Sequence, residues 1–243
     1  MEQEKPVLVF LHYFGGSAES WQWVADLLSP NYRCIQIDLP GFGQRQALAT
    51  PSIKAFAVEV QHYLQDLGIE AYALIGHSMG GKVAMQIAAD DRELGKVTRL
   101  ILFAPSPPTV ERMPAEEQER MLIHPNAEQA ATTVKNGTVK PLGREQYDVA
   151  IATQLMADHQ TWHWWIKEGI YDSIAEEVLG ITVPITVIAS KDDPAVTAAM
   201  TAHDTLPNLP KHTVLLNTEG IGHLFPLEDA QWTADQLDTI MTS

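Results

Sequence analysis

The chain has 243 residues, of which 31 are acidic and 16 basic, so its formal net charge at pH 7 is −15. This length fits one large domain, or one domain that carries an insertion. The acidic balance argues against a protein that binds nucleic-acid phosphates or an anionic membrane surface, because both need a clustered basic face. The only cysteine, Cys34, excludes an intrachain disulfide and metal sites built from paired cysteines.

The N-terminal sequence does not have the pattern of a signal peptide. Glu2 and Glu4 stand where positive charges would be expected, and the apolar run VLVFL is short. No stretch of the sequence approaches the roughly 18 consecutive apolar residues of a membrane span. We therefore expect a cytoplasmic protein without a membrane segment, and no pattern in the sequence predicts its oligomeric state.

Short apolar segments rich in β-branched residues recur along the chain and are typical of buried strands. They are residues 7–11, 34–37, 73–75, 100–103, 185–189 and 213–216. Between several of them, apolar residues repeat at helical spacing, most clearly over 56–67, before Gly68. Strands that alternate with helices predict an α/β fold with a mostly parallel sheet that helices cover on both faces.

The segment from about 105 to 180 departs from this alternation. It begins with three prolines, contains no convincing strand, and is rich in Glu, Gln, Met and Trp. Helical fragments are expected around 114–123, 145–157 and 161–167. We predict a core made of residues 1–104 and 181–243, with residues 105–180 inserted as a helical cap.

The strongest chemical signal is the sequence Gly-His-Ser-Met-Gly at 76–80, which follows a predicted strand and precedes a helix-like segment at 82–89. This G-x-S-x-G pattern puts Ser78 on a tight strand-to-helix turn, where glycines leave room for the adjoining strand and helix. The next helix directs backbone N–H groups at developing negative charge. We predict that Ser78 is a nucleophile; the alternative is a plain turn with a surface serine.

A serine nucleophile needs a base, because its hydroxyl attacks poorly while it keeps its proton. His223 lies in the glycine-rich loop GIGHLFPLE after the last predicted strand. That loop reaches the carboxyl edge of the sheet, where the Ser78 turn also emerges, so we predict that His223 is the base. The histidines at 62, 124, 159, 203 and 212 are expected to be ordinary surface or core residues.

The third member of such a set is a carboxylate between the serine and the histidine in chain order. Asp192 and Asp193 directly follow the predicted strand at 185–189, so both stand at its carboxyl end. Spacing alone does not choose between them, and a simple turn with helix-capping character is the alternative.

The loop HYFGGS follows the first predicted strand and can offer a backbone N–H to an oxyanion. Phe14 is the expected donor in this loop, and Met79, directly after the nucleophile, is the expected second donor. The alternative for the loop is an ordinary glycine turn.

Aromatic residues in the cap are the main candidates for the substrate pocket. Trp162 and Trp165 share one helical face, so they are expected either to roof the pocket or to pack the cap against the core. Tyr13 and His77, which flank the predicted reacting groups in the sequence, are further pocket candidates.

Four sequence blocks follow one another in the chain: LHYFGGSAESW, DLPGFGQ, GHSMGG, and SKDD followed by GIGHLFPLED. In these blocks the chain resembles α/β-hydrolase fold proteins, in the group of single-domain esterases, cofactor-free haloperoxidases or perhydrolases, and carbon–carbon hydrolases. The resemblance covers about residues 6–104 and 183–241. It implies an α/β-hydrolase fold and a Ser-His-Asp triad that works without a cofactor.

The resemblance also points to one of the two aspartates. In the family, the acid stands three residues after a glycine at the end of its strand; Ser190 takes that glycine's place here, which points to Asp193. The family's usual His-Gly pair is His12-Tyr13 in this chain, a departure that concerns the oxyanion loop. Haloalkane dehalogenases and epoxide hydrolases carry aspartate at the nucleophile position, so Ser78 argues against both activities.

The expected reaction is hydrolysis of a small-molecule carboxylic ester through an acyl-enzyme, with a preference for small or medium apolar esters. The same triad serves carbon–carbon bond, lactone, thioester or perhydrolysis chemistry, so these alternatives stay open. A ligand-binding protein that keeps the fold and a slow triad is the non-enzymatic alternative. No cofactor, metal or nucleic-acid partner is expected, because the sequence has no dinucleotide-binding, P-loop or H-E-x-x-H motif.

Overall fold

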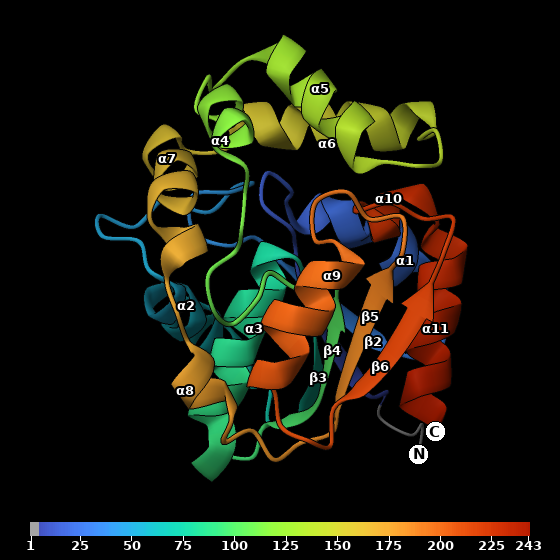
Figure 1. The fold of residues 1–243 in the computed structure, drawn as a ribbon. Helices are drawn as coiled ribbons and strands as arrows, with labels where there is room; N and C mark the ends of the chain where they lie inside the picture. The colour runs from blue at the N-terminus through green and yellow to red at the C-terminus, as the bar shows by residue number, and fades with distance from the viewer. Residues whose placement is uncertain (1–4) are drawn as a thin grey trace.

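The computed structural model describes residues 5–243; Glu2 and Glu4 of the N-terminal prediction lie outside the described residues (Figure 1). Within residues 5–243, six parallel strands form one sheet in the order β2-β1-β3-β4-β5-β6. The strands are β1 (Val7–Leu11), β2 (Arg33–Ile37), β3 (Tyr72–His77), β4 (Val97–Phe103), β5 (Ile185–Ser190) and β6 (Val214–Thr218). The predicted α/β fold with a mostly parallel sheet is confirmed.

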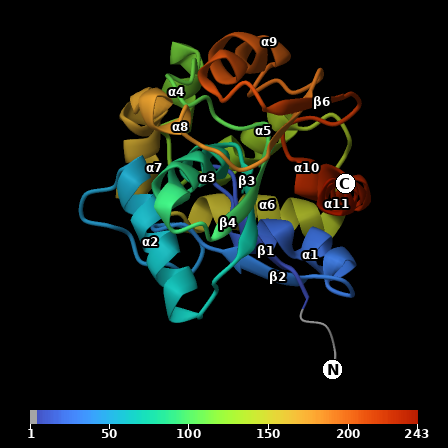
Figure 2. The same ribbon diagram turned by 90° about the horizontal axis from the view of Figure 1, so that it is seen from below.

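Helices cover both faces of this sheet (Figure 2). On one face α1 (Gln22–Leu28) packs against α11 (Ala230–Thr242), and on the other α2 (Ile53–Asp66) packs against α3 (Met79–Asp90). Two short helices, α9 (Ala198–Met200) and α10 (Phe225–Glu228), follow β5 and β6. None of the helices within residues 5–243 is both long and apolar enough to cross a membrane.

Two separate hydrophobic cores, one on each side of the sheet, explain why the strand sequences are continuously apolar. Leu8 and Phe10 of β1 join a core with Trp21 on one side of the sheet, whereas Val9 and Leu11 join the core on the other side. Because successive side chains of a strand point to opposite faces, a sheet covered by helices on both sides needs apolar residues at every position.

The segment between β4 and β5 is helical. Its helices are α4 (Ala115–Met121), α5 (Ala127–Gly137), α6 (Arg144–Met156), α7 (His159–Lys167) and α8 (Ala175–Val178). Figure 1 shows α4, α5 and α6 beyond the carboxyl ends of the strands, whereas α8 packs beside the sheet against α3. Helix α5 was not expected from the sequence, because Ala130 and Val134 alone form its buried face.

Close backbone approach shapes the turn between β3 and α3. Ser78 has φ 53° and ψ −118°, a conformation that a residue with a side chain rarely adopts. A Cβ atom at Gly76 would come within 2.6 Å of the Gly80 carbonyl oxygen and 2.7 Å of the Gly81 Cα atom. Glycine is therefore required at position 76 for α3 to begin directly above the end of β3.

We expect Gly76→Ala to lower the free energy of unfolding by about 1–3 kcal/mol or more, because the added methyl group meets backbone atoms that cannot move aside cheaply. Gly137→Ala is the matched control, since a Cβ there has its nearest neighbours at 4.0 Å. Urea unfolding followed by circular dichroism measures both. Equal stability of the two variants would contradict this account of the turn.

Candidate active site

Ser78, His223 and Asp193 form a continuous hydrogen-bonded series at the carboxyl edge of the sheet. Ser78 Oγ lies 2.9 Å from His223 Nε2, and His223 Nδ1 lies 2.8 Å from Asp193 Oδ2. All three residues are buried. The other carboxylate oxygen of Asp193 accepts hydrogen bonds from the N–H groups of Ala195 and Val196, which fixes the carboxylate toward the imidazole.

The structure brings Asp193, and not Asp192, to the histidine. Asp192 Oδ2 accepts a hydrogen bond of 2.6 Å from the backbone N–H of Gly220, which holds its side chain on the exposed side of the turn. Ser190, which replaces the family's glycine, donates its hydroxyl to the carbonyl of Ile221. The end of β5 is therefore tied to the loop that carries His223 by two side-chain bonds.

The pKa of His223 lies above the ordinary histidine value. Burial acts to lower it, but the charge of Asp193 and its hydrogen bond outweigh burial, and Glu111 and Glu228 act in the same direction as Asp193. The carboxylate thus stabilises the protonated imidazole that would form when His223 takes a proton from Ser78.

His77, a pocket candidate in the sequence, instead lies beneath the site. Its Nε2–H donates to the His223 carbonyl oxygen over 2.7 Å, and its ring lies 5.2 Å from the Tyr13 ring. Burial, and then the neighbouring His223, hold the pKa of His77 well below its usual range, so the ring is neutral. His77 therefore supports the backbone of the His223 loop and does not line the pocket.

His12 shapes the loop after β1. Its Nε2 accepts from the Leu39 N–H (3.0 Å), and its Nδ1–H donates to the Tyr13 carbonyl (2.7 Å); burial lowers the pKa of His12 to about 4, so the ring is neutral. Across a trans peptide the N–H points opposite to the carbonyl, so the Phe14 N–H points away from His12. Met79 begins α3, where the N–H has no partner inside the helix.

Asp38, in the block DLPGFGQ, fixes the same loop from the end of β2. Its Oδ1 accepts from the Ala18 N–H at 2.7 Å, and its Oδ2 accepts from the Gln44 N–H at 2.9 Å. A Cβ atom at Gly43 would collide with this carboxylate. Asp38 therefore stabilises the loops after β1 and β2 and is not one of the reacting groups.

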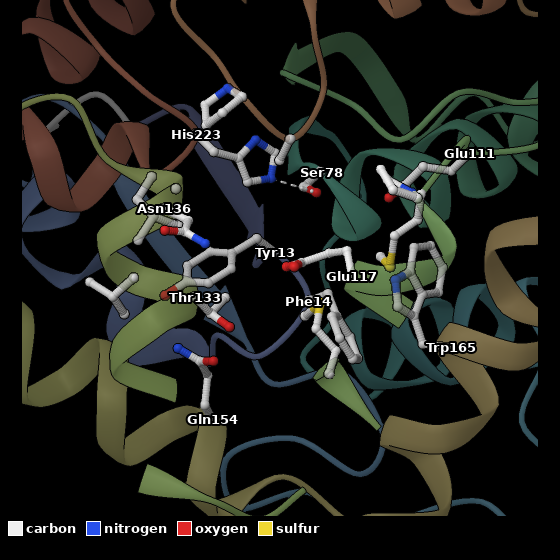
Figure 3. Close-up of a pocket in the computed structure, with 18 residues that line it drawn as sticks. Tyr13, Phe14, Ser78, Glu111, Glu117, Thr133, Asn136, Gln154, Trp165 and His223 are labelled. Atoms are coloured by element: carbon white, nitrogen blue, oxygen red, sulfur yellow. Dashed lines mark hydrogen bonds between the residues drawn. The ribbon is translucent and has the colours of Figure 1, made fainter. Parts of the chain in front are cut away.

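A cavity of about 360 Å³ lies next to Ser78 and is called the Ser78 cavity here (Figure 3). Tyr13 and Trp165, both predicted, line it. Figure 3 shows Tyr13 and Asn136 on one side of Ser78 and Trp165 with Glu111 on the other.

Trp162 does not line the Ser78 cavity. Its Nε1–H donates to the Met121 carbonyl over 2.7 Å, and its ring stacks on His124 at a centroid distance of 4.1 Å. This ring also packs on Phe14 at 4.2 Å. Trp162 therefore joins α7 to the loop after β1, as the packing alternative for this residue predicts.

Sequence reasoning missed several polar residues around the cavity. Glu111 and Gln154 line it but belong to no motif, so no signal in the sequence could have found them. Glu228 stands in the block GIGHLFPLED, and its Oε2 accepts from the N–H groups of Gly222 and Val139. Its position in the same block as His223 was the sequence feature that could have pointed to it.

A family model described as alpha/beta hydrolase family matches residues 8–236 of the chain. The chain belongs to the alpha/beta hydrolase family. The resemblance inferred from the four sequence blocks is thereby confirmed.

The curated relatives are similar to this chain over only part of their own length. A 2-succinyl-6-hydroxy-2,4-cyclohexadiene-1-carboxylate synthase from Yersinia enterocolitica is 39% identical over 90 residues, 37% of this chain and 32% of that protein. A dihydrolipoyllysine-residue acetyltransferase component of an acetoin cleaving system from Cupriavidus necator is 40% identical over 84 residues, 34% of this chain and 22% of that protein. The chain thus matches a third or less of the length of these relatives.

Solved structures of the family extend the likeness to the whole fold. An esterase from Exiguobacterium antarcticum has a TM-score of 0.89 at 18% identity, over 99% of this chain and 93% of that one. At this level of identity, the similarity establishes the alpha/beta hydrolase fold alone.

We expect Asp193→Asn to lower the pKa of His223, because the variant removes the negative charge that favours the imidazolium. NMR titration of the His223 ring protons measures this change directly. Asp192→Asn is the matched control and should leave the His223 titration unchanged, since Asp192 bonds to Gly220. A larger effect of Asp192→Asn would reverse the assignment of the acid.

Proposed function

We propose that this chain is a serine hydrolase that works through a Ser78–His223–Asp193 triad and an acyl-enzyme, with small or medium apolar carboxylic esters as its substrates. The observation that carries the proposal is the hydrogen-bonded series itself, which ends at Ser78 on the wall of the Ser78 cavity. Family membership supports the hydrolase class.

In the first half of the reaction, Ser78 Oγ attacks the ester carbonyl carbon while His223 Nε2 accepts the hydroxyl proton. The 2.9 Å separation of these two atoms suits that transfer. Asp193 keeps the Nδ1–H of the ring in place and stabilises the imidazolium. The N–H groups of Met79 and Phe14 donate to the oxygen that becomes negative.

The tetrahedral intermediate then collapses, and the His223 imidazolium gives its proton to the leaving alcohol oxygen, which leaves an acyl-enzyme on Ser78. A water molecule then loses a proton to His223 and attacks the acyl carbon. The second tetrahedral intermediate then collapses: the bond between the acyl carbon and Ser78 Oγ breaks, the His223 imidazolium returns its proton to Ser78 Oγ, and the acid is released. No cofactor takes part in these steps.

The walls of the cavity support an uncharged ester of modest size. Phe14, Met113 and Trp165 provide apolar surface, and the described residues that line the cavity include no lysine or arginine that would bind a carboxylate or phosphate group on the substrate. A volume of about 360 Å³ accommodates a short acyl chain and a small alcohol, but not a long-chain lipid.

We also propose that residues 105–180 act as a cap that selects the substrate. Met113, Met121 and Trp165 from this segment line the cavity together with Ser78. Thr153 donates its hydroxyl to the Gly15 carbonyl at 2.9 Å, so the segment also contacts the loop after β1.

We expect Ser78→Ala to lower the turnover of p-nitrophenyl butyrate by roughly four orders of magnitude or more, as the loss of a nucleophile does in other serine hydrolases. The same variant should lose covalent labelling by a fluorophosphonate. Ser29→Ala, at an exposed position after α1, is the control and should keep both signals. Labelling that survives Ser78→Ala would contradict the proposal.

A panel of substrates separates ester hydrolysis from the other reactions of such a triad. Short esters, a lactone, a thioester and a vinylogous diketone are compared by kcat/KM with the wild-type protein. We expect the short esters to lead the panel. A diketone or a long-chain ester as the best substrate would contradict the ester specificity, while a burst of product without steady turnover would favour a ligand-binding protein.

A further inference from the structure

Glu111 is a buried carboxyl group that the proposed mechanism does not use. It stands between β4 and α4, and its backbone N–H donates to the Ile170 carbonyl at 2.8 Å. Only 9% of its surface is exposed, and it lines the Ser78 cavity. Figure 3 shows it on the same side of Ser78 as Trp165.

The side chain of Glu111 has an unsatisfied oxygen. Among residues 5–243, its Oε2 is buried without a hydrogen-bond partner, and the Ser106 hydroxyl lies beside the carboxyl group. A buried polar group left without a partner costs about 1–3 kcal/mol. Because Glu111 lines the Ser78 cavity, a ligand there can supply the partner that this oxygen lacks.

No charged side chain neutralises Glu111 directly. Within the described part of the chain, Glu111 forms no ion pair; the nearby Lys82 instead donates its ammonium to the Thr109 carbonyl at 2.8 Å. Glu117, the other acidic residue of the cavity, is paired with Arg120. Burial raises the pKa of Glu111, while Ser106 and Lys82 act to lower it.

A hydroxyl group is a small uncharged group that fits this carboxyl in either of its protonation states. It donates to an ionised carboxylate and accepts from a carboxylic acid. An ammonium group would fit only the ionised state and would lose its hydration between apolar walls, and an anion would be repelled.

We propose that Glu111 is a specificity-determining residue, whose Oε2 binds a hydroxyl group on the acyl or alcohol part of the ester close to the bond that is cleaved. This inference rests on the proposed ester hydrolysis at Ser78. It narrows the substrate class from apolar esters in general to short esters that carry one hydroxyl group.

The experiment uses esters of nearly equal shape. On the acyl side they are methyl 3-hydroxybutanoate, methyl 3-methylbutanoate and methyl 3-aminobutanoate; on the alcohol side they are the 2-hydroxypropyl, isobutyl and 2-aminopropyl butanoates. Each is assayed by kcat/KM with wild type, Glu111→Gln, Glu111→Leu and the control Glu119→Gln, which alters an exposed position of α4.

We expect the wild type to prefer the hydroxyl ester in at least one series. Glu111→Leu should shift the ratio of hydroxyl to methyl ester by roughly tenfold toward the methyl ester, the order expected for one lost hydrogen bond. Glu111→Gln should keep most of the preference, because an amide also donates and accepts. Glu119→Gln should not change the ratio.

An unchanged ratio in Glu111→Leu, in both series, would overturn the inference. So would a preference for the amino esters that Glu111→Gln abolishes, since that result identifies a cation site. Dissociation constants of the same esters are measured by NMR in a Ser78→Ala background, with and without Glu111→Leu. Failure of the proposed function alone would appear as no Ser78-dependent turnover while the binding ratio still depends on Glu111.

Discussion

The left-handed backbone of Ser78 is the constraint on which the rest of the site depends. Such a conformation costs on the order of 1–3 kcal/mol. It persists because Gly76 lets α3 begin close to β3, and because Gly80 lets α3 approach the end of β1. The Ser78 carbonyl also accepts from the N–H groups of Gly81, Lys82 and Ser106. The turn directs the hydroxyl beyond the sheet edge toward His223 and starts α3 immediately behind it.

The helices beyond the sheet are bonded to both loops that approach Ser78. The His223 N–H donates to the carbonyl of Gly137 at the end of α5 over 2.6 Å, and Thr153 of α6 donates to the Gly15 carbonyl. The Glu228 carboxylate accepts from the N–H of Val139, which follows α5, and from the N–H of Gly222 in the His223 loop. Consequently, these helices cannot shift far without disturbing the position of the imidazole, so the shape of the cavity and the geometry of the reacting groups are linked.

The parts of this structure that could be predicted are those with local signals. Alternating strand and helix patterns predicted the sheet and its covering helices, and Ser78 and His223 each stand in a short glycine-rich segment that indicates their chemistry. The turn after β5 indicated an aspartate, but only the family resemblance pointed to Asp193 and not to Asp192. The cavity wall depends instead on how α7 rotates against the core. Helical spacing grouped Trp162 with Trp165, but the bond from Trp162 to Met121 turns one ring into the packing and leaves the other in the wall. Glu111 has no neighbouring pattern at all, because its burial arises only in the folded chain.

The overall charge of the chain says little about the electrostatics inside it. Lys82, one turn after Ser78, is completely buried, and burial lowers its pKa to about 8, although Glu111 and Asp172 act in the other direction. Its bond to the Thr109 carbonyl fixes the segment two residues before Glu111, and the Glu111 N–H is held by Ile170. The backbone that presents the Glu111 carboxyl is therefore ordered before any ligand arrives. Because the entropy cost of ordering this backbone is met on folding, a hydrogen bond from a ligand to the unsatisfied Glu111 oxygen contributes more fully to the binding free energy.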